Sequence, residues 1–116
     1  MRRRRSSEIS PGASSIGVAL AHAVLHHTSP SSGSTVPTAP TEVSLWFTEN
    51  LEGAFSSVEV TDSSGGRVDQ GKAQVSGNAM RVGLKALAPG SYRVHWRAVA
   101  VDTHKSEGDF TFKVGQ

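Results

Sequence analysis

Two short groups of residues, far apart in the chain, carry nitrogen and oxygen atoms that could bind a metal ion. Ala19-Leu20-Ala21 precede His22, and small residues at the third and first positions before a cut are what signal peptidase accepts. Cleavage there would give His22 a free α-amino group, so this one residue would offer both its amine and its ring Nδ1. Asp102-Thr103-His104 supplies a second compact pair of ligands. In extended backbone, side chains two residues apart project from the same face, about 6.5–7 Å apart along the strand, and could converge on one ion.

The combined donor set indicates which metal would bind. Three nitrogens and one carboxylate oxygen suit a tetragonal Cu(II) site, and Cu(II) heads the affinity order for such ligands. Zinc more often takes tetrahedral sets of histidine or cysteine. The amine must lose its proton to bind, and its free pKa is about 7.7–8.0, so affinity should fall as pH drops. The Asp-x-His spacing is common by chance, and it leaves open that both residues are exposed loop residues without a ligand role.

The N-terminal part of this 116-residue chain has the order of an export signal, with a basic start followed by an apolar stretch. Arg2 to Arg5 form the basic start, and Ile16 to Ala21 form the apolar stretch. We therefore expect residues 1–21 to be a signal peptide and residues 22–116 to be one domain. The apolar stretch is shorter than usual, so either the signal is weak or the assigned start codon is wrong. Twin-arginine export is another route, and a basic tail without export is the alternative.

The charge distribution argues against a nucleic-acid partner. The formal net charge is +2, and removing residues 1–21 takes away four arginines and one glutamate, leaving about −1. A nucleic-acid binder would need a basic patch on the folded part. The chain has no cysteine, which excludes disulfides and thiolate metal sites. No apolar stretch approaches the roughly 20 residues that cross a bilayer.

Short alternating segments separated by turn residues predict an all-β fold. The segment from Tyr92 to Ala98 places its apolar side chains on one face, and the segment from Phe110 to Val114 does the same after Gly108 opens the strand. Further strands are expected over 23–25, 43–47, 58–61, 68–75 as a polar edge, and 80–84. About seven short strands indicate an immunoglobulin-like antiparallel β-sandwich with Greek-key connections. Its core would be filled by Tyr92, Trp96, Phe110 and Phe112.

Several of these segments together resemble a known family. Val94-His95-Trp96-Arg97-Ala98-Val99-Ala100-Val101-Asp102-Thr103-His104, followed by Gly108 and Phe110-Thr111-Phe112-Lys113-Val114, resembles the C-terminal part of the copper resistance protein C (CopC) family. His22-Ala23-Val24-Leu25, Ser29-Pro30 and Leu45-Trp46-Phe47-Thr48-Glu49 match its N-terminal part. The residues that lead into the first of these segments, Pro89-Gly90-Ser91-Tyr92, are also similar to the family. The resemblance covers residues 22 to 114, and the occurrence of these segments together in one chain is quite specific to the family.

The resemblance implies a copper site and a cellular setting. It implies a periplasmic, cell-envelope or secreted protein that binds one Cu(II) ion through a histidine brace. His22 would give its amine and Nδ1, His104 a ring nitrogen and Asp102 a carboxylate, with Glu49 as a weak ligand or a carboxylate that orients the ligands. A CopD-like membrane copper importer is the implied partner. We expect a monomeric protein of copper homeostasis that is not an enzyme and acts as a buffer or carrier.

Two other functions remain as alternatives, each with its own discriminating test. Polysaccharide monooxygenases and related copper oxidases use the same brace, but they carry a flat aromatic surface, and an aspartate ligand would occupy a position that oxygen chemistry needs open. Peroxide formation with ascorbate and polysaccharide cleavage would test this alternative. The third hypothesis is a metal-free immunoglobulin-like binding module, which predicts no copper-dependent rise in thermal stability.

The remaining histidines and methionines receive weaker assignments. Met80 falls in a strand alternation and Met1 would be lost with the signal, so a methionine Cu(I) site like that of some relatives is not expected. His26 and His27 are expected to be solvent-exposed, with a second, weaker metal contact as the alternative. His95 is expected to have a surface or intersheet hydrogen-bonding role, with a role as a metal ligand as the alternative. Arg97 would pair with Glu49 or Asp102, or form a plain surface salt bridge.

Overall fold

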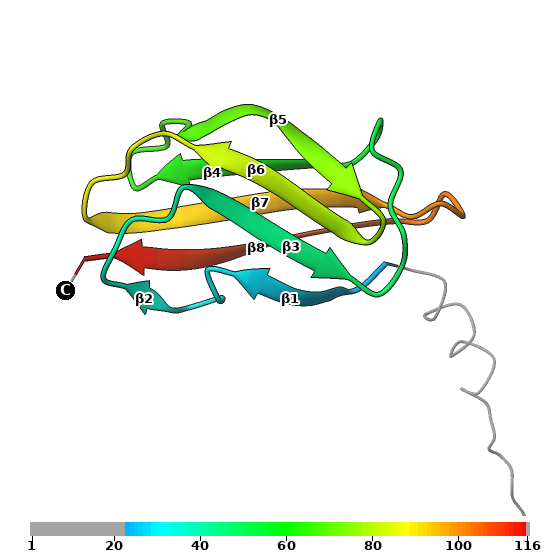
Figure 1. The fold of residues 1–116 in the computed structure, drawn as a ribbon, viewed down its shortest axis with the longest axis horizontal. Coiled ribbons are helices and arrows are strands. Elements are labelled where there is room, and N and C mark those ends of the chain that lie inside the picture. The colour runs from blue at the N-terminus through cyan, green and yellow to red at the C-terminus, as the bar shows by residue number, and fades with distance from the viewer. Residues whose placement is uncertain (1–22, 116) are drawn as a thin grey trace, which may run out of the picture.

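The computed structural model describes residues 23–115, which form two stacked β-sheets (Figure 1). One sheet has the order β1-β3-β6-β5 and the other the order β2-β8-β7-β4. The strands are β1 (Leu25–Ser29), β2 (Thr35–Val36), β3 (Glu42–Phe47), β4 (Ser57–Asp62), β5 (Asp69–Ser76), β6 (Ala79–Leu84), β7 (Gly90–Val99) and β8 (Lys105–Val114). The predicted all-β sandwich is therefore confirmed.

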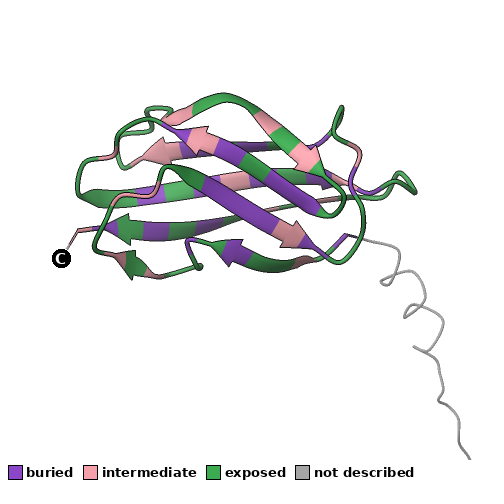
Figure 2. Ribbon diagram, in the orientation of Figure 1, coloured by how far each residue is buried: buried purple, intermediate pink, exposed green. Residues whose placement is uncertain are grey.

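Strand alternation builds the core between the sheets. The inward side chains of β7 and β8 include all four predicted core aromatics, and each of them is buried: Tyr92, Trp96, Phe110 and Phe112. Figure 2 shows the alternation of buried and exposed residues along the strands. The ring of Phe47 from the opposite sheet lies edge-on to Trp96, with ring centroids 5.2 Å apart. Because the core draws on both sheets, apolar packing holds them together without a disulfide.

Three details differ from the sequence expectation. The first strand was expected over 23–25, but β1 runs from Leu25 to Ser29, because its pairing with β3 continues to Ser29 opposite Ser44. The last strand begins at Lys105, three positions before Gly108, because ladder pairing with β7 continues to Val99 opposite Lys105. The sandwich is also not wholly antiparallel, since the two-residue strand β2 pairs parallel to β8. Prolines at positions 37 and 40 restrict this segment to an edge, which explains why its alternation is too short to read as a strand.

Gly108 permits the tightest contact on the inner face of β8. It lies opposite Trp96 in the ladder, and an added Cβ would meet the indole Cζ2 at 2.8 Å. Any larger residue would therefore push the tryptophan away from Phe47. Glycine here is a packing requirement, because its φ is not among the positive ones.

The polar segment predicted as an edge is β5, which lies at the end of its sheet next to β6. Its side chains are mostly exposed, and its pairing with β6 is irregular between Gln70 and Gln74. Irregular, polar edges resist pairing with other chains. Within residues 23–115, no helix is long and apolar enough to cross a membrane.

Candidate metal centre

The Asp102–His104 pair lies at the tip of the hairpin that joins β7 to β8. The tip is closed by hydrogen bonds from the Ala100 amide to the His104 carbonyl at 2.9 Å and from the Thr103 amide to the Ala100 carbonyl at 2.8 Å. Thr103 adopts a positive φ of 75°, a conformation typical of tight turns. Extended backbone was the expectation for this segment, and that expectation is wrong: a turn brings the two side chains together.

The two side chains are in direct contact. The Nδ1 atom of His104 lies 3.3 Å from Oδ1 of Asp102, and the His104 amide donates a hydrogen bond to the same oxygen at 3.2 Å. Metal bonds of about 2.0–2.1 Å place neighbouring ligand atoms about 3 Å apart. The spacing of the nitrogen and the oxygen therefore suits one shared ion, and both side chains are about half exposed to solvent.

The hydrogen bond from the His104 amide lowers the pKa of Asp102 below its usual value, and the nearby imidazole adds to this effect. A carboxylate must be ionised to bind a metal. The turn therefore favours the ionised, ligating form of this carboxylate.

The described chain begins beside this turn and is fixed there by three hydrogen bonds. The Ser106 hydroxyl donates to the Ala23 carbonyl at 2.7 Å, and Ala23 is only 1% exposed. The Val24 amide donates to Thr48 Oγ1 at 3.0 Å, and the Thr48 amide donates back to the Val24 carbonyl at 2.9 Å. Ser106 lies two residues after His104, so the residue that directly follows His22 is held next to the turn.

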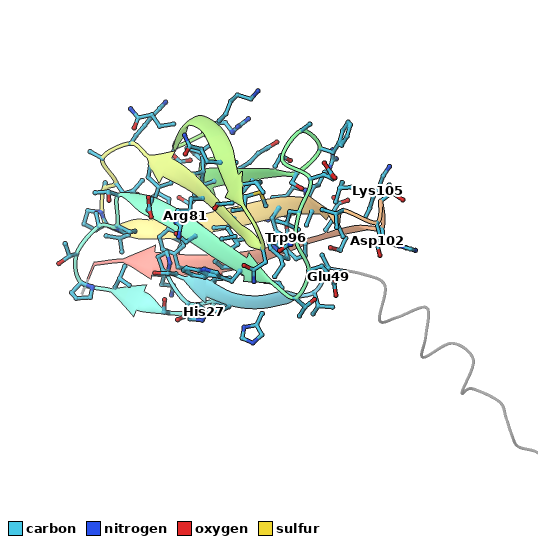
Figure 3. The ribbon with its side chains drawn as sticks, turned by 45° about the vertical axis from the view of Figure 1, so that its right-hand side comes forward. His27, Glu49, Arg81, Trp96, Asp102 and Lys105 are labelled. Carbon is cyan, nitrogen blue, oxygen red and sulfur yellow. The ribbon has the colours of Figure 1, made fainter. Side chains whose placement is uncertain are left out.

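Glu49 lies in the segment that crosses the same end of the sandwich. The Asn50 carbonyl accepts a hydrogen bond from the Val101 amide at 3.1 Å, and Leu51 forms a bridge with Ala100. Figure 3 shows Glu49 and Asp102 at one end of the molecule. The segment that carries Glu49 thus lies beside the turn, while its role as a weak or orienting ligand remains a prediction.

The four predicted metal-site residues are therefore only partly brought together. Asp102 and His104 are in contact and Glu49 belongs to a segment beside them, whereas His22 lies outside the described residues. Among residues 23–115, no three or more His, Asp or Glu side chains form a group that could hold an ion. The pair at the turn needs a further donor to make a complete site, and the fixed position of Ala23 indicates where the chain can supply one.

His95 and Arg97 belong to a surface network and are separate from the turn pair. His95 contacts Asp109 Oδ1 through Nδ1 at 2.6 Å and Glu107 Oε2 through Nε2 at 3.1 Å. The predicted surface role of His95 is thus confirmed. Arg97 lies 3.9 Å from Glu107, which is the plain surface salt bridge among the options considered, and such exposed pairs contribute little stability.

The sequence interpretation missed the two hydroxyl residues that fix the start of the domain, Thr48 and Ser106. One signal was present for Ser106, since it occupies an inward position of β8 in phase with Gly108 and Phe110. A hydroxyl at a position where the alternation demands an apolar side chain indicates a specific hydrogen-bond partner. That partner is 83 positions away in the chain, which no local pattern can reveal.

Comparisons with known proteins agree on one family. The CopC domain model matches residues 25–115. Copper resistance protein C of Pseudomonas syringae pv. tomato is 35% identical over 106 residues, covering 84% of this chain and 83% of the relative. Protein YobA of Escherichia coli (strain K12) is 34% identical over 98 residues, covering 81% of this chain and 79% of the relative. Copper transport protein CutJ of Bacillus subtilis is 35% identical over 101 residues, but the match spans 84% of this chain and only 19% of CutJ.

Solved structures give the same result. The crystal structure of CopC from Methylosinus trichosporium OB3b has a TM-score of 0.76 at 33% identity, covering 81% of this chain and 94% of that one. PcoC, a methionine-rich copper resistance protein from Escherichia coli, has a TM-score of 0.72 at 35% identity, covering 81% and 99%. The match of the family model, the sequence identities and the shared fold place this chain in the CopC family.

Proposed function

We propose that this protein is an exported Cu(II)-binding protein of copper homeostasis. After removal of residues 1–21, one Cu(II) ion would be held by the amine and Nδ1 of His22, a ring nitrogen of His104 and the carboxylate of Asp102, with Glu49 as a weak or orienting ligand. The observation that carries the proposal is the hydrogen bond from Ser106 to Ala23, 2.7 Å long. It fixes the residue after His22 beside the Asp102–His104 turn.

The chemistry of the donor set supports copper. Nitrogen ligands with one carboxylate suit tetragonal Cu(II), and the contact between His104 and Asp102 already places a nitrogen and an oxygen 3.3 Å apart. The lowered pKa of Asp102 keeps its carboxylate available. Relatives named for copper resistance and copper transport support a copper-related role.

Capture and release of the ion is the mechanism that fits an exposed site. Both turn side chains are about half exposed, so an ion there exchanges with solvent or with a partner without opening the core. Protonation of the amine, reduction of the copper or ligand exchange would release it. The protein would work as a monomeric buffer or carrier in the cell envelope and would pass copper to a CopD-like membrane importer. With Asp102 as an anionic ligand in place of an open position, no oxidase chemistry is expected.

The decisive experiment joins the mass of the exported protein to its copper spectrum. Intact-mass measurement is expected to give a chain that starts at His22, and this chain is expected to retain one Cu(II) against a competing chelator. Electron paramagnetic resonance should change in His104→Ala and in Asp102→Ala, whereas His95→Ala serves as the control with an unchanged spectrum. A different starting residue, or unaltered spectra in both turn variants, would overturn the brace.

A further inference from the structure

A β-bulge in β1 places two adjacent histidines on the same side of the sheet. Leu25 pairs with Phe47 and His27 pairs with Trp46, so His26 is the extra residue between consecutive partners. Ala23 and Leu25 face inward before it, and Thr28 faces inward after it. In a regular strand, neighbouring side chains point to opposite faces. The bulge breaks this rule at the histidine pair, and both imidazoles are exposed.

The ring nitrogens of this pair differ in their surroundings from those of His95. The ring of His27 lies 4.9 Å from the ring of Trp46, tilted by 36°, so the indole restricts its movement. Within the described part of the chain, no hydrogen bond or ion pair occupies the ring nitrogens of His26 or His27. Both nitrogens of His95, in contrast, contact carboxylates. The pair on β1 is therefore available to an external ligand.

Two imidazoles on consecutive residues favour a late transition-metal ion. Consecutive Cα atoms are 3.8 Å apart, and flexible imidazoles from that base can reach a common ion. Imidazole suits copper, nickel and zinc, and Cu(II) binds most strongly in that series. Residues 23–115 contain no larger group of His, Asp or Glu around the pair, so water would complete the coordination and the affinity would be modest.

We propose that His26 and His27 form a second, weaker copper site, separate from the turn, in which both imidazoles bind one Cu(II) ion and water fills the remaining positions. The site lies on the strand that leads directly to Ala23 and so to the proposed terminal ligand. It would bind copper at the exposed surface of β1. This inference does not depend on cleavage before His22, because both histidines belong to the folded strand.

The test uses the full chain carrying His104→Ala, titrated with Cu(II) chloride. One ion is expected to bind in the micromolar range, to broaden amide resonances of β1 and of the facing β3, and to quench the fluorescence of Trp46. Adding His26→Ala or His27→Ala should each weaken this binding at least about tenfold, because each change removes one of two direct ligands, and loss of even an outer-shell partner typically costs about 10–100-fold in affinity. Adding His95→Ala is the matched control and should change nothing.

Two further variants assign the ion to its site. Trp46→Phe should remove most of the quenching while the broadening of β1 persists, and His22→Ala should leave both effects in place. Persistence of the binding in the His26→Ala/His27→Ala double variant would overturn the proposal. Loss of the binding in His22→Ala, or broadening confined to the β7–β8 turn, would do the same. If the proposed histidine brace were wrong, the chain that starts at His22 would lack the more tightly bound ion. That result is distinct from loss of the weaker ion at His26 and His27.

Discussion

The hydrogen bond between Ser106 and Ala23 offers the sharpest test of how the protein would position the proposed terminal ligand. In Ser106→Ala the hydroxyl that donates to the Ala23 carbonyl at 2.7 Å is lost. Ala23 is 1% exposed, so its carbonyl would remain buried without this partner. A buried polar group left unsatisfied costs about 1–3 kcal/mol. The free energy of unfolding of the copper-free protein should therefore fall by that amount.

The same change should weaken copper binding. A segment that is no longer held beside the turn must be ordered each time an ion binds, and 1.4 kcal/mol corresponds to a factor of ten in affinity. We therefore expect Cu(II) affinity to fall by about tenfold, measured by competition with a chelator of known affinity, next to urea unfolding without copper. Ser34→Ala is the matched control, because its hydroxyl also donates to a carbonyl at 2.7 Å, that of Ser31, away from the turn.

The reasoning would be refuted by one combination of results. If Ser106→Ala lowers the free energy of unfolding but leaves Cu(II) affinity equal to that of Ser34→Ala, the anchored segment has no part in the metal site. The Asp102–His104 pair would then have to find its remaining ligands elsewhere.

Three further predictions follow from contacts in the sandwich. Gly108→Ala should lower the free energy of unfolding by about 1–3 kcal/mol, measured by urea denaturation, because the new Cβ would lie 2.8 Å from the Trp96 ring; unchanged stability would contradict the packing. Asp69 has a lowered pKa, chiefly through its hydrogen bond with Arg67, so its stabilising contribution is full above the unfolded-state pKa of about 3.9 and is lost as pH falls through the lower folded value. In Asp69→Asn the free energy of unfolding should therefore depend less on pH in the acid range. An unchanged pH dependence would contradict the stabilising role of the ionised Asp69 carboxylate. Apparent Cu(II) affinity should fall steadily as pH drops below the free amine pKa of about 7.7–8.0, because the amine must lose its proton to bind whereas the pKa of Asp102 is lowered; an affinity that stays constant down to about pH 5 would contradict an amine ligand.

The sequence predicted the parts of the fold that depend on strand alternation. The strands that became β3, β4, β6 and β7 each show two or more apolar residues in phase, and burial of one face follows directly from that pattern. The start of β8 was missed because Lys105, Ser106 and Glu107 have no apolar residue to set the phase. Pairing with β7, a tertiary interaction, defines that part of the strand.

The geometry of the candidate site was only partly predicted, and its ligand set stays a prediction. The sequence identified Asp102 and His104 as neighbours, but the backbone between them is a turn with Thr103 at positive φ, which local residue types did not indicate. The bulge at His26 was equally hidden, because a register shift is defined by the partner strand. Local sequence patterns thus identify which side chains could bind a metal. The direction in which each side chain points depends on strand pairing between distant parts of the chain.

The anchoring of Ala23 by Ser106 joins points 83 positions apart in a chain without cysteine. An ion shared between the residue before Ala23 and the β7–β8 turn would act as a removable cross-link around a loop of nearly the whole domain. Chain-entropy arguments assign about 4–5 kcal/mol to a covalent link of that span. The bound ion would then stabilise the fold as a cross-link does, and the resistance of the purified protein to proteolysis would show whether copper is bound.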